Sequence, residues 1–422
     1  MLAQTSGASV YPAYKSDKSA ARVDIALLVS ALFLQRFSLP FGATRLALDL
    51  VAIGCILSYQ FLSGKFAIQY DRALWFLGFA LAITCSLLLN FNSTMLTAYF
   101  QFMVFYALFT LSRPSTPDQY RRTLQAFQFL VMILSCLAIA QFVAQFVVDA
   151  KQLVMFFGIV PDFLFDDLHA GGNITIGAVS GGSSLMRSNG IFLAEPSILS
   201  QITALGILIE SLEFRRPRYL LVMALGFLVA YSGTGSVLLL LFLPLAGLRH
   251  GRAGLSVLLV AMFALGLFAT GIIDLSVFTS RAGEFEDTRA SGFARFVSPF
   301  WLAAKQFNTV SVQALLLGSG PGTVKFLADT WYAGFVATWI KILYEYGMIG
   351  SFLFCCFLAS CLRRSRCPGL VVAAIIFTYV FLQGMMTITI ALCTLSGPAP
   401  RRRHIGGSSQ YQPSFVAGSA AG

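Results

Sequence analysis

A cation, a carboxylate and a proline lie close together in the middle of the chain. The segment Arg187-Ser-Asn-Gly-Ile-Phe-Leu-Ala-Glu195-Pro196-Ser197 leads directly into an apolar stretch. Proline suits the first turn of a helix, because its fixed φ fits there and its missing N–H costs nothing. An ionisable side chain at the edge of a membrane-spanning helix is costly unless it is paired or functional, so Arg187 and Glu195 are candidate site residues. The structural alternative is that Glu195 caps the helix and Arg187 reaches out to lipid head groups.

Three further arginines, Arg281, Arg289 and Arg295, are interspersed with acidic residues in a second polar segment. A guanidinium group is planar and permanently charged, and it grips phosphate oxygens with a two-pronged fork. The cluster therefore predicts a phosphate-binding site, with a solvated group of surface salt bridges as the alternative. For any one of these arginines considered alone, the alternative is favoured. Arg295 differs from the others because aromatic residues surround it, namely Phe293, Phe296, Phe300 and Trp301.

Two features nearer the C-terminus give less specific signals. The run Gly318-Ser-Gly-Pro-Gly322 lacks the Gly-Lys-Ser/Thr ending and the strand–turn–helix context of a nucleotide-binding loop, so we expect a tight backbone turn. Glu345 lies in an apolar helix, where we expect it to bond a partner helix, with a place in the lining of a cavity as the alternative. The three histidines have no metal-binding spacing, and the eight cysteines lie in or beside apolar runs, so we assign no metal site and no disulfide.

The composition is that of a membrane protein. Only 11% of the 422 residues are charged and 57% are hydrophobic, whereas a soluble domain has about 25% charged residues. Apolar runs of nearly membrane-spanning length recur along most of the chain. The formal charge of +11 is spread between these runs and is not gathered on one face, which excludes a nucleic-acid-binding domain. The apolar composition also excludes a disordered chain and a small disulfide scaffold. We predict an all-α polytopic membrane protein.

Spans of roughly 20 apolar residues predict about 11 or 12 transmembrane helices. We place them near residues 23–41, 44–62, 73–91, 94–112, 124–147, 197–213, 218–231, 234–248, 254–273, 338–361 and one or two within 368–396. Basic residues mark the cytoplasmic ends, as the positive-inside rule requires. They are Lys15, Lys18, Arg22, Lys65, Arg72, Arg113, Arg121, Arg122, Arg215, Arg216, Arg218, Arg249, Arg252, Arg363, Arg364, Arg366, Arg401, Arg402 and Arg403. We favour twelve crossings, because the alternation requires two short helices around Tyr231–Ser236 and a second segment near Gln383-Gly384.

This topology divides the chain into seven parts. They are a cytoplasmic tail (1–22), transmembrane helices 1–5 (23–147), a first long periplasmic loop (148–196), helices 6–9 (197–273), a second long periplasmic loop (274–337), the C-terminal transmembrane helices (338–396) and a cytoplasmic tail (397–422). Residues 1–22 lack a short apolar core with a cleavage motif, so we expect the first span to remain as an anchor. Loops as long as these two tend to be either functional or disordered. Both carry amphipathic material, such as Ala294–Phe307, which predicts a helix along the membrane surface.

Taken in order, these landmarks resemble the superfamily of O-antigen ligases and Wzy-type polysaccharide polymerases, which are bacterial inner-membrane glycosyltransferases. The resemblance covers about Met186 to Cys361, and the preceding spans match only in number and hydropathy. Its components are Arg187…Gly190-Ile-Phe-x-x-Glu195-Pro196-Ser197, Ser232-Gly-Thr-Gly-Ser236, Ser291…Arg295, Gly318-x-Gly320-Pro-Gly322 and Glu345-Tyr-Gly-Met-Ile-Gly350. The order and topological placement of these elements carry the resemblance, because no single element is specific.

The resemblance implies a GT-C-type glycosyltransferase fold whose active face is periplasmic. The implied substrate is an oligosaccharide carried on undecaprenyl pyrophosphate in the bilayer, with a chain-length regulator and a flippase as the partners such an enzyme could have. Family arginines grip the pyrophosphate leaving group, and the matching positions are Arg187 and, less closely, Arg281, Arg289 or Arg295. Fixed guanidinium groups would stabilise the developing negative charge without a metal or other cofactor. Glu195 is the first candidate for the catalytic base, followed by Asp329 and Glu345.

One departure from the superfamily favours a polymerase. Ligases usually carry a His-Asn pair nine residues before the glutamate of their glutamate-x-glycine motif, where this chain has Val336-Ala337. We therefore expect a polymerase that transfers the growing lipid-linked glycan onto a fresh lipid-linked repeat unit. The first alternative is a ligase that transfers finished glycan to a lipid or protein acceptor. The second is a transporter or flippase of lipid-linked sugars, although the chain shows no internal repeat of the kind transporters have.

Overall fold

The computed structural model describes residues 18–41, 44–113, 117–148, 160–164, 186–249, 293, 297–309, 311–324, 337–362, 369–382 and 386–395. These residues are mostly helical, and four of their helices are long and apolar enough to cross a membrane. The four are Tyr70–Leu89, Asp118–Ala144, Pro196–Phe214 and Thr338–Leu362. Shorter apolar helices accompany them. The predicted class of helical membrane protein is compatible with this architecture, while the full number of crossings stays a prediction.

The N-terminal part contains a β-hairpin that the hydropathy pattern did not predict. Helix α1 (Lys18–Phe33) ends well before residue 41, the predicted end of the first span. Strands β1 (Ser38–Phe41) and β2 (Thr44–Ala47) pair antiparallel and lead into α2 (Leu48–Leu62). Pro40 agrees with this, because a residue without an N–H is unfavourable inside a helix that would continue to residue 41.

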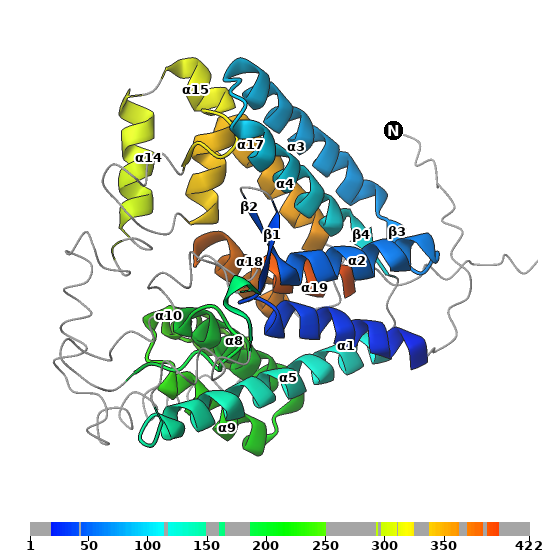
Figure 1. Cartoon of the computed structure of the whole chain (residues 1–422), viewed down its shortest axis with the longest axis vertical. Coiled ribbons are helices and arrows are strands. Elements are labelled where there is room, and N and C mark those ends of the chain that lie inside the picture. Colours follow the sequence, from blue (N-terminus) through cyan, green and yellow to red (C-terminus); the bar gives the residue numbers. More distant parts are fainter. Residues whose placement is uncertain are drawn as a thin grey trace, which may run out of the picture.

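One group of helices, α3 (Tyr70–Leu89), α4 (Met95–Ala107) and α17 (Thr338–Leu362), packs around a cluster of aromatic side chains; Figure 1 shows these helices next to one another. Helix α3 packs along α17, and α4 lies beside α3. The ring of Phe79 in α3 contacts Phe102 of α4 at 5.6 Å and Phe354 of α17 at 5.2 Å between centroids. A 3-10 turn, η1 (Leu108–Thr110), follows α4, and strands β3 (Ala67–Ile68) and β4 (Leu111–Ser112) pair at this end.

A second group contains α5 (Pro117–Ala144), α8 (Pro196–Ile209), α9 (Pro217–Val229) and α10 (Gly233–Arg249), drawn cyan-green to green in Figure 1. Helix α8 packs on α10 and α9, and α5 packs on α9. A π-helical turn, η4 (Glu210–Phe214), extends α8. The predicted interruption is confirmed, because α9 and α10 are separate helices, but the break lies between Val229 and Gly233, and Gly233–Ser236 form the first turn of α10.

The remaining elements include the two helices expected near the C-terminus. Helices α18 (Gly369–Phe381) and α19 (Met386–Leu395) replace the single long span that 368–396 could have formed. The short turn η3 (Asp162–Leu164) belongs to the first long loop. In the second long loop, α14 (Ser298–Thr309) is the expected amphipathic helix, with Leu302 buried and Phe300 and Trp301 exposed. A one-turn-and-a-half helix, α15 (Val312–Leu317), follows it. The predicted span 254–273 lies outside the described residues.

Two of the basic residues that served as cytoplasmic markers are buried structural groups. The guanidinium of Arg72 donates to main-chain carbonyls of Phe109, Leu111, Cys361 and Cys393 at 2.8–3.3 Å. Arg113 forms an ion pair with Asp24 of α1 at 2.7 Å, and the Thr123 hydroxyl donates to the same carboxylate at 2.8 Å. These contacts satisfy carbonyls and charges that would be costly if buried alone, and they join the ends of several helices.

Candidate functional site

The Arg187 segment, defined as Met186–Glu195, is a non-helical stretch of chain that precedes α8. Its backbone is attached to the end of α9, because the N–H of Ser188 donates to the Val229 carbonyl at 3.0 Å. Gly190 and Ile191 both have a φ of +69°. A left-handed conformation is costly for a β-branched residue and persists only where surrounding contacts impose it. The guanidinium of Arg36, from the connection between α1 and β1, donates to the Ile191 carbonyl.

Two glutamines bind the backbone of this segment. Gln141 lies in the last turn of α5 and Gln145 directly follows the helix, and we call them the glutamine pair. The side-chain oxygen of Gln141 accepts from the N–H groups of Asn189, Gly190 and Ile191 at 3.2, 3.0 and 3.2 Å. It also accepts from the Ser188 hydroxyl at 2.6 Å. Gln145 accepts from the N–H of Met186 at 2.7 Å. Sequence reasoning missed both glutamines, since nothing local connects them to a segment more than 40 residues away.

Glu195 begins α8 in the way its sequence predicts, but its carboxylate does not cap the helix. The backbone of Glu195 is extended, Pro196 occupies the first turn, and no side-chain hydrogen bond to the helix backbone is made at this position. The carboxylate instead accepts from the Ser197 hydroxyl at 2.7 Å. Glu195 is partly exposed, and Arg187 is partly exposed in the same short segment. Both residues thus lie in the non-helical segment before α8, and the lack of a side-chain cap disfavours the capping alternative for Glu195.

The first turns of α8 and α10 pack directly against each other beside this segment. The Thr234 hydroxyl donates to the Ser197 carbonyl at 3.2 Å, and the N–H of Gly235 donates to the Ser200 hydroxyl at 3.2 Å. A Cβ at Gly235 would lie 2.3 Å from the Ser200 carbonyl oxygen, so only glycine permits this approach. The run Ser232-Gly-Thr-Gly-Ser236 thus places two helix N-termini together. The partial positive charge of each favours an anion nearby.

Tyr231 is a further residue of this region that sequence reasoning did not single out. It lies between α9 and α10 with a φ of +45°, and its ring stacks on Phe142 of α5 at 5.9 Å between centroids. Burial raises the pKa of the Tyr231 phenol above its ordinary value. A phenol keeps its proton at neutral pH even with its ordinary pKa of about 10, so the hydroxyl can serve as a hydrogen-bond donor.

The other predicted site residues divide into two groups. Arg281, Arg289 and Arg295 lie outside the described residues, as does Asp329. Glu345 belongs to α17, which packs chiefly on α3 and α15.

The glycine loop, Gly318–Gly322, packs on α17 at Glu345. All three of its glycines have positive φ values, which confirms the expected tight turn. The N–H groups of Ser319 and Gly320 donate to the carbonyls of Tyr344 and Glu345 at 2.9 and 3.1 Å. Ser86 of α3 also donates to the Glu345 carbonyl, at 2.7 Å. Helix α17 is interrupted just beyond, at Gly347, whose φ of +66° and ψ of −169° are not helical. These contacts hold the main chain of α17 in place, and the role of the Glu345 carboxylate stays a prediction.

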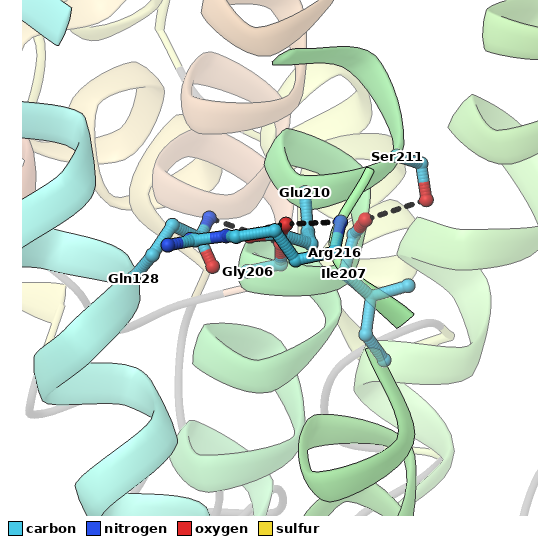
Figure 2. Close-up of polar contacts among 6 residues, drawn as sticks. All are labelled: Gln128, Gly206, Ile207, Glu210, Ser211 and Arg216. Carbon is cyan, nitrogen blue, oxygen red and sulfur yellow. Dashed lines mark hydrogen bonds and ion pairs between the residues drawn. The ribbon is translucent and has the colours of Figure 1, made fainter. Parts of the chain in front are cut away.

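The opposite end of α8 carries a buried ion pair, shown in Figure 2. Glu210 is fully buried, and both of its oxygens accept from the Arg216 guanidinium, at 2.8 and 2.9 Å. The backbone N–H of Arg216 donates to the same carboxylate at 2.8 Å. Hydrogen bonding to Glu210 raises the pKa of Arg216 above its ordinary value. Arg216 also covers the rings of Phe214 and Tyr219, at 4.8 and 3.7 Å from their centroids.

We expect Arg216→Ala to destabilise the protein by about 2 kcal/mol. Removing one partner of a buried ion pair costs about 3–5 kcal/mol, because the other charge stays buried, and the 34% exposure of the Arg216 side chain reduces that cost through solvent screening. The measurement is the thermal unfolding midpoint of the purified protein in detergent. Arg218→Ala is the matched control, because Arg218 is an exposed arginine only two residues away, in the first turn of α9. Equal midpoints for the two variants would contradict the ion pair.

Comparison with known proteins does not assign the chain to a family. No protein-family model matches the chain, and a search of curated proteins finds no match either. A functional assignment therefore rests on the chemistry of the Arg187 segment and its surroundings.

Proposed function

We propose that the protein is a metal-independent glycosyltransferase of the bacterial inner membrane, and specifically a Wzy-type polysaccharide polymerase. It transfers the growing glycan from undecaprenyl pyrophosphate onto a lipid-linked repeat unit at the periplasmic face. The single observation that carries this proposal is the composition of the Arg187 segment. Arg187 and Glu195 lie in one non-helical segment whose backbone is hydrogen-bonded to Gln141, beside the packed first turns of α8 and α10.

The chemistry of the transfer matches these groups. A glycosidic bond to a lipid diphosphate breaks with negative charge developing on the departing diphosphate, and fixed positive groups stabilise that charge. Arg187 supplies a planar fork suited to phosphate oxygens, and the N-termini of α8 and α10 add partial positive charge. Arg281, Arg289 and Arg295 are the further candidates for this clamp.

Glu195 is the proposed base for the acceptor hydroxyl. A general base must reach the proton it removes, and a carboxylate at the start of α8 lies in the same element as the proposed clamp. Its hydrogen bond from Ser197, at 2.7 Å, fixes the orientation of the carboxylate. Asp329 and Glu345 are the less favoured candidates, and Glu345 is fully buried in α17.

The experiment that tests the proposal is the analysis of lipid-linked glycans, by chain length and membrane leaflet, in a strain from which the gene is deleted. A missing polymerase should leave single repeat units on undecaprenyl pyrophosphate in the periplasmic leaflet. Complementation with the intact gene is the control and should restore long chains.

Each competing function gives a different result in the same experiment. Full-length chains that remain on undecaprenyl pyrophosphate would identify a ligase. Repeat units trapped in the cytoplasmic leaflet would identify a flippase. Either result would refute the polymerase assignment.

A further inference from the structure

We propose that the glutamine pair, Gln141 and Gln145, is a positioning device that holds Arg187 in place for the diphosphate. This inference rests on the proposed function, and it assigns a role to two residues that do not touch the reacting atoms. The two side chains are four positions apart on α5 and its C-terminal end, so they project from the same face. Together they bind the backbone on both sides of Arg187.

Within the glutamine pair, Gln141 makes the larger number of hydrogen bonds to the segment. Three consecutive N–H groups, from Asn189 to Ile191, converge on its single side-chain oxygen at 3.0–3.2 Å. Successive N–H groups that point to one spot form the kind of concavity that usually receives an anion, and here the amide oxygen of Gln141 fills it. The Gln141 amide nitrogen donates to the Asn189 side chain at 3.0 Å. Asn189 in turn donates to the Leu193 carbonyl at 2.7 Å.

Gln145 holds the other side of Arg187. Its oxygen accepts from the N–H of Met186 at 2.7 Å, and its nitrogen donates to the Met186 carbonyl at 3.4 Å. The residues before and after Arg187 are therefore both fixed to α5. Helix α5 is itself packed against α9 and α1, so the arginine is attached to a rigid part of the bundle.

The backbone conformation of the segment shows why it needs the hydrogen bonds from the glutamine pair. A φ of +69° at Ile191 is unfavourable for a β-branched residue. Without compensating hydrogen bonds, the segment would relax to a more favourable conformation and carry Arg187 with it. A displacement of about 1 Å in a group that binds the reacting part of a substrate costs up to about 100-fold in rate. The glutamine pair thus stabilises a strained backbone that presents the guanidinium.

The first test measures the segment without reference to any substrate. Hydrogen exchange of the peptide covering Met186–Leu193 is compared in the purified full-length protein and in Gln141→Leu. We expect the amides of Asn189, Gly190 and Ile191 to exchange at least about 10-fold faster in the variant. The matched control is Gln128→Leu, because Gln128 is a buried glutamine of the same helix whose hydrogen bond, at 3.0 Å, goes to the Gly206 carbonyl. Unchanged exchange in Gln141→Leu would overturn the proposal.

The second test measures whether the glutamine pair affects binding of the diphosphate. Binding of undecaprenyl diphosphate to the purified protein should weaken about 10-fold in Gln141→Leu and by less than about 3-fold in Gln128→Leu. Gln145→Leu removes only the partly exposed member of the glutamine pair and should weaken binding by an intermediate factor. This variant keeps the test usable if Gln141→Leu folds poorly. Combining Gln141→Leu with Arg187→Lys should weaken binding no more than Arg187→Lys does, because both changes act through the same group.

The outcomes separate this inference from the proposed function. Fully additive effects of Gln141→Leu and Arg187→Lys would show that Gln141 acts independently of Arg187 and would overturn the inference alone. Normal binding in Gln141→Leu together with weak binding in Arg187→Ala would do the same. No binding of undecaprenyl diphosphate by the intact protein would refute the proposed function, whereas the exchange experiment would still decide whether the glutamine pair orders the segment.

Discussion

Replacing Arg187 by alanine should abolish long polymer while the protein still inserts and accumulates at its normal level. Removing one fixed donor that stabilises a developing negative charge costs about 100- to 1,000-fold in rate. Arg187 lies in a segment whose backbone is held by the glutamine pair and Val229, so truncating its partly exposed side chain should leave the fold intact. The measurement is the length distribution of lipid-linked glycan in a deletion strain that carries the variant gene. The same result is expected for Arg295→Ala.

The conservative variant sharpens this prediction. Arg187→Lys retains the positive charge but loses the planar fork that grips two phosphate oxygens, so we expect it also to make little polymer. If both alanine variants made polymer of normal amount and length, the diphosphate clamp would be wrong. Labelling that placed Arg187 on the same side of the membrane as Arg363 would also refute it, because the proposed transfer takes place on the periplasmic side.

Gly318→Ala should prevent stable folding, with an expected cost of about 3–5 kcal/mol from overpacking and backbone strain together. Gly318 has a φ of +82°, and a Cβ there would lie 2.2 Å from the Glu345 carbonyl oxygen and 2.4 Å from the Tyr346 nitrogen. Both obstacles are main-chain atoms of α17, which cannot move aside as a flexible side chain can. The measurement is the amount of monodisperse protein after detergent extraction and its thermal unfolding midpoint.

A matched glycine separates the steric cost from the conformational one. Gly64 has a φ of +69°, and a Cβ there would meet nothing within 4 Å. Gly64→Ala should therefore cost only about 1–2 kcal/mol, the penalty of a left-handed alanine. If Gly318→Ala were no less stable than Gly64→Ala, the close packing of the glycine loop on α17 would be wrong.

Structural features that depend on residues close together in the sequence could be predicted from the sequence alone. Pro196 indicated the start of a helix, and α8 begins there because proline fits the first turn. The glycines between 318 and 322 indicated a turn, and their positive φ values are the conformations that glycine allows. The break near Ser232 and the division of 368–396 were predicted from the alternation of basic residues along the chain. The hairpin β1–β2 was missed, because hydropathy does not distinguish an apolar strand from an apolar helix.

The sequence by itself determined that this is a helical membrane-type protein and that an arginine and a glutamate stand just before a helix, because hydropathy, charge and proline act within a few residues. Only the tertiary structure decided what those residues contact. The glutamine pair binds the backbone on both sides of Arg187, more than 40 residues away in the chain. Arg72 and Arg113 proved to be buried hydrogen-bonding groups near helix ends. A basic residue at a helix end has the same local sequence whether it faces water or satisfies buried carbonyls. The difference depends on partners that are distant in the chain and become neighbours only when the helices pack.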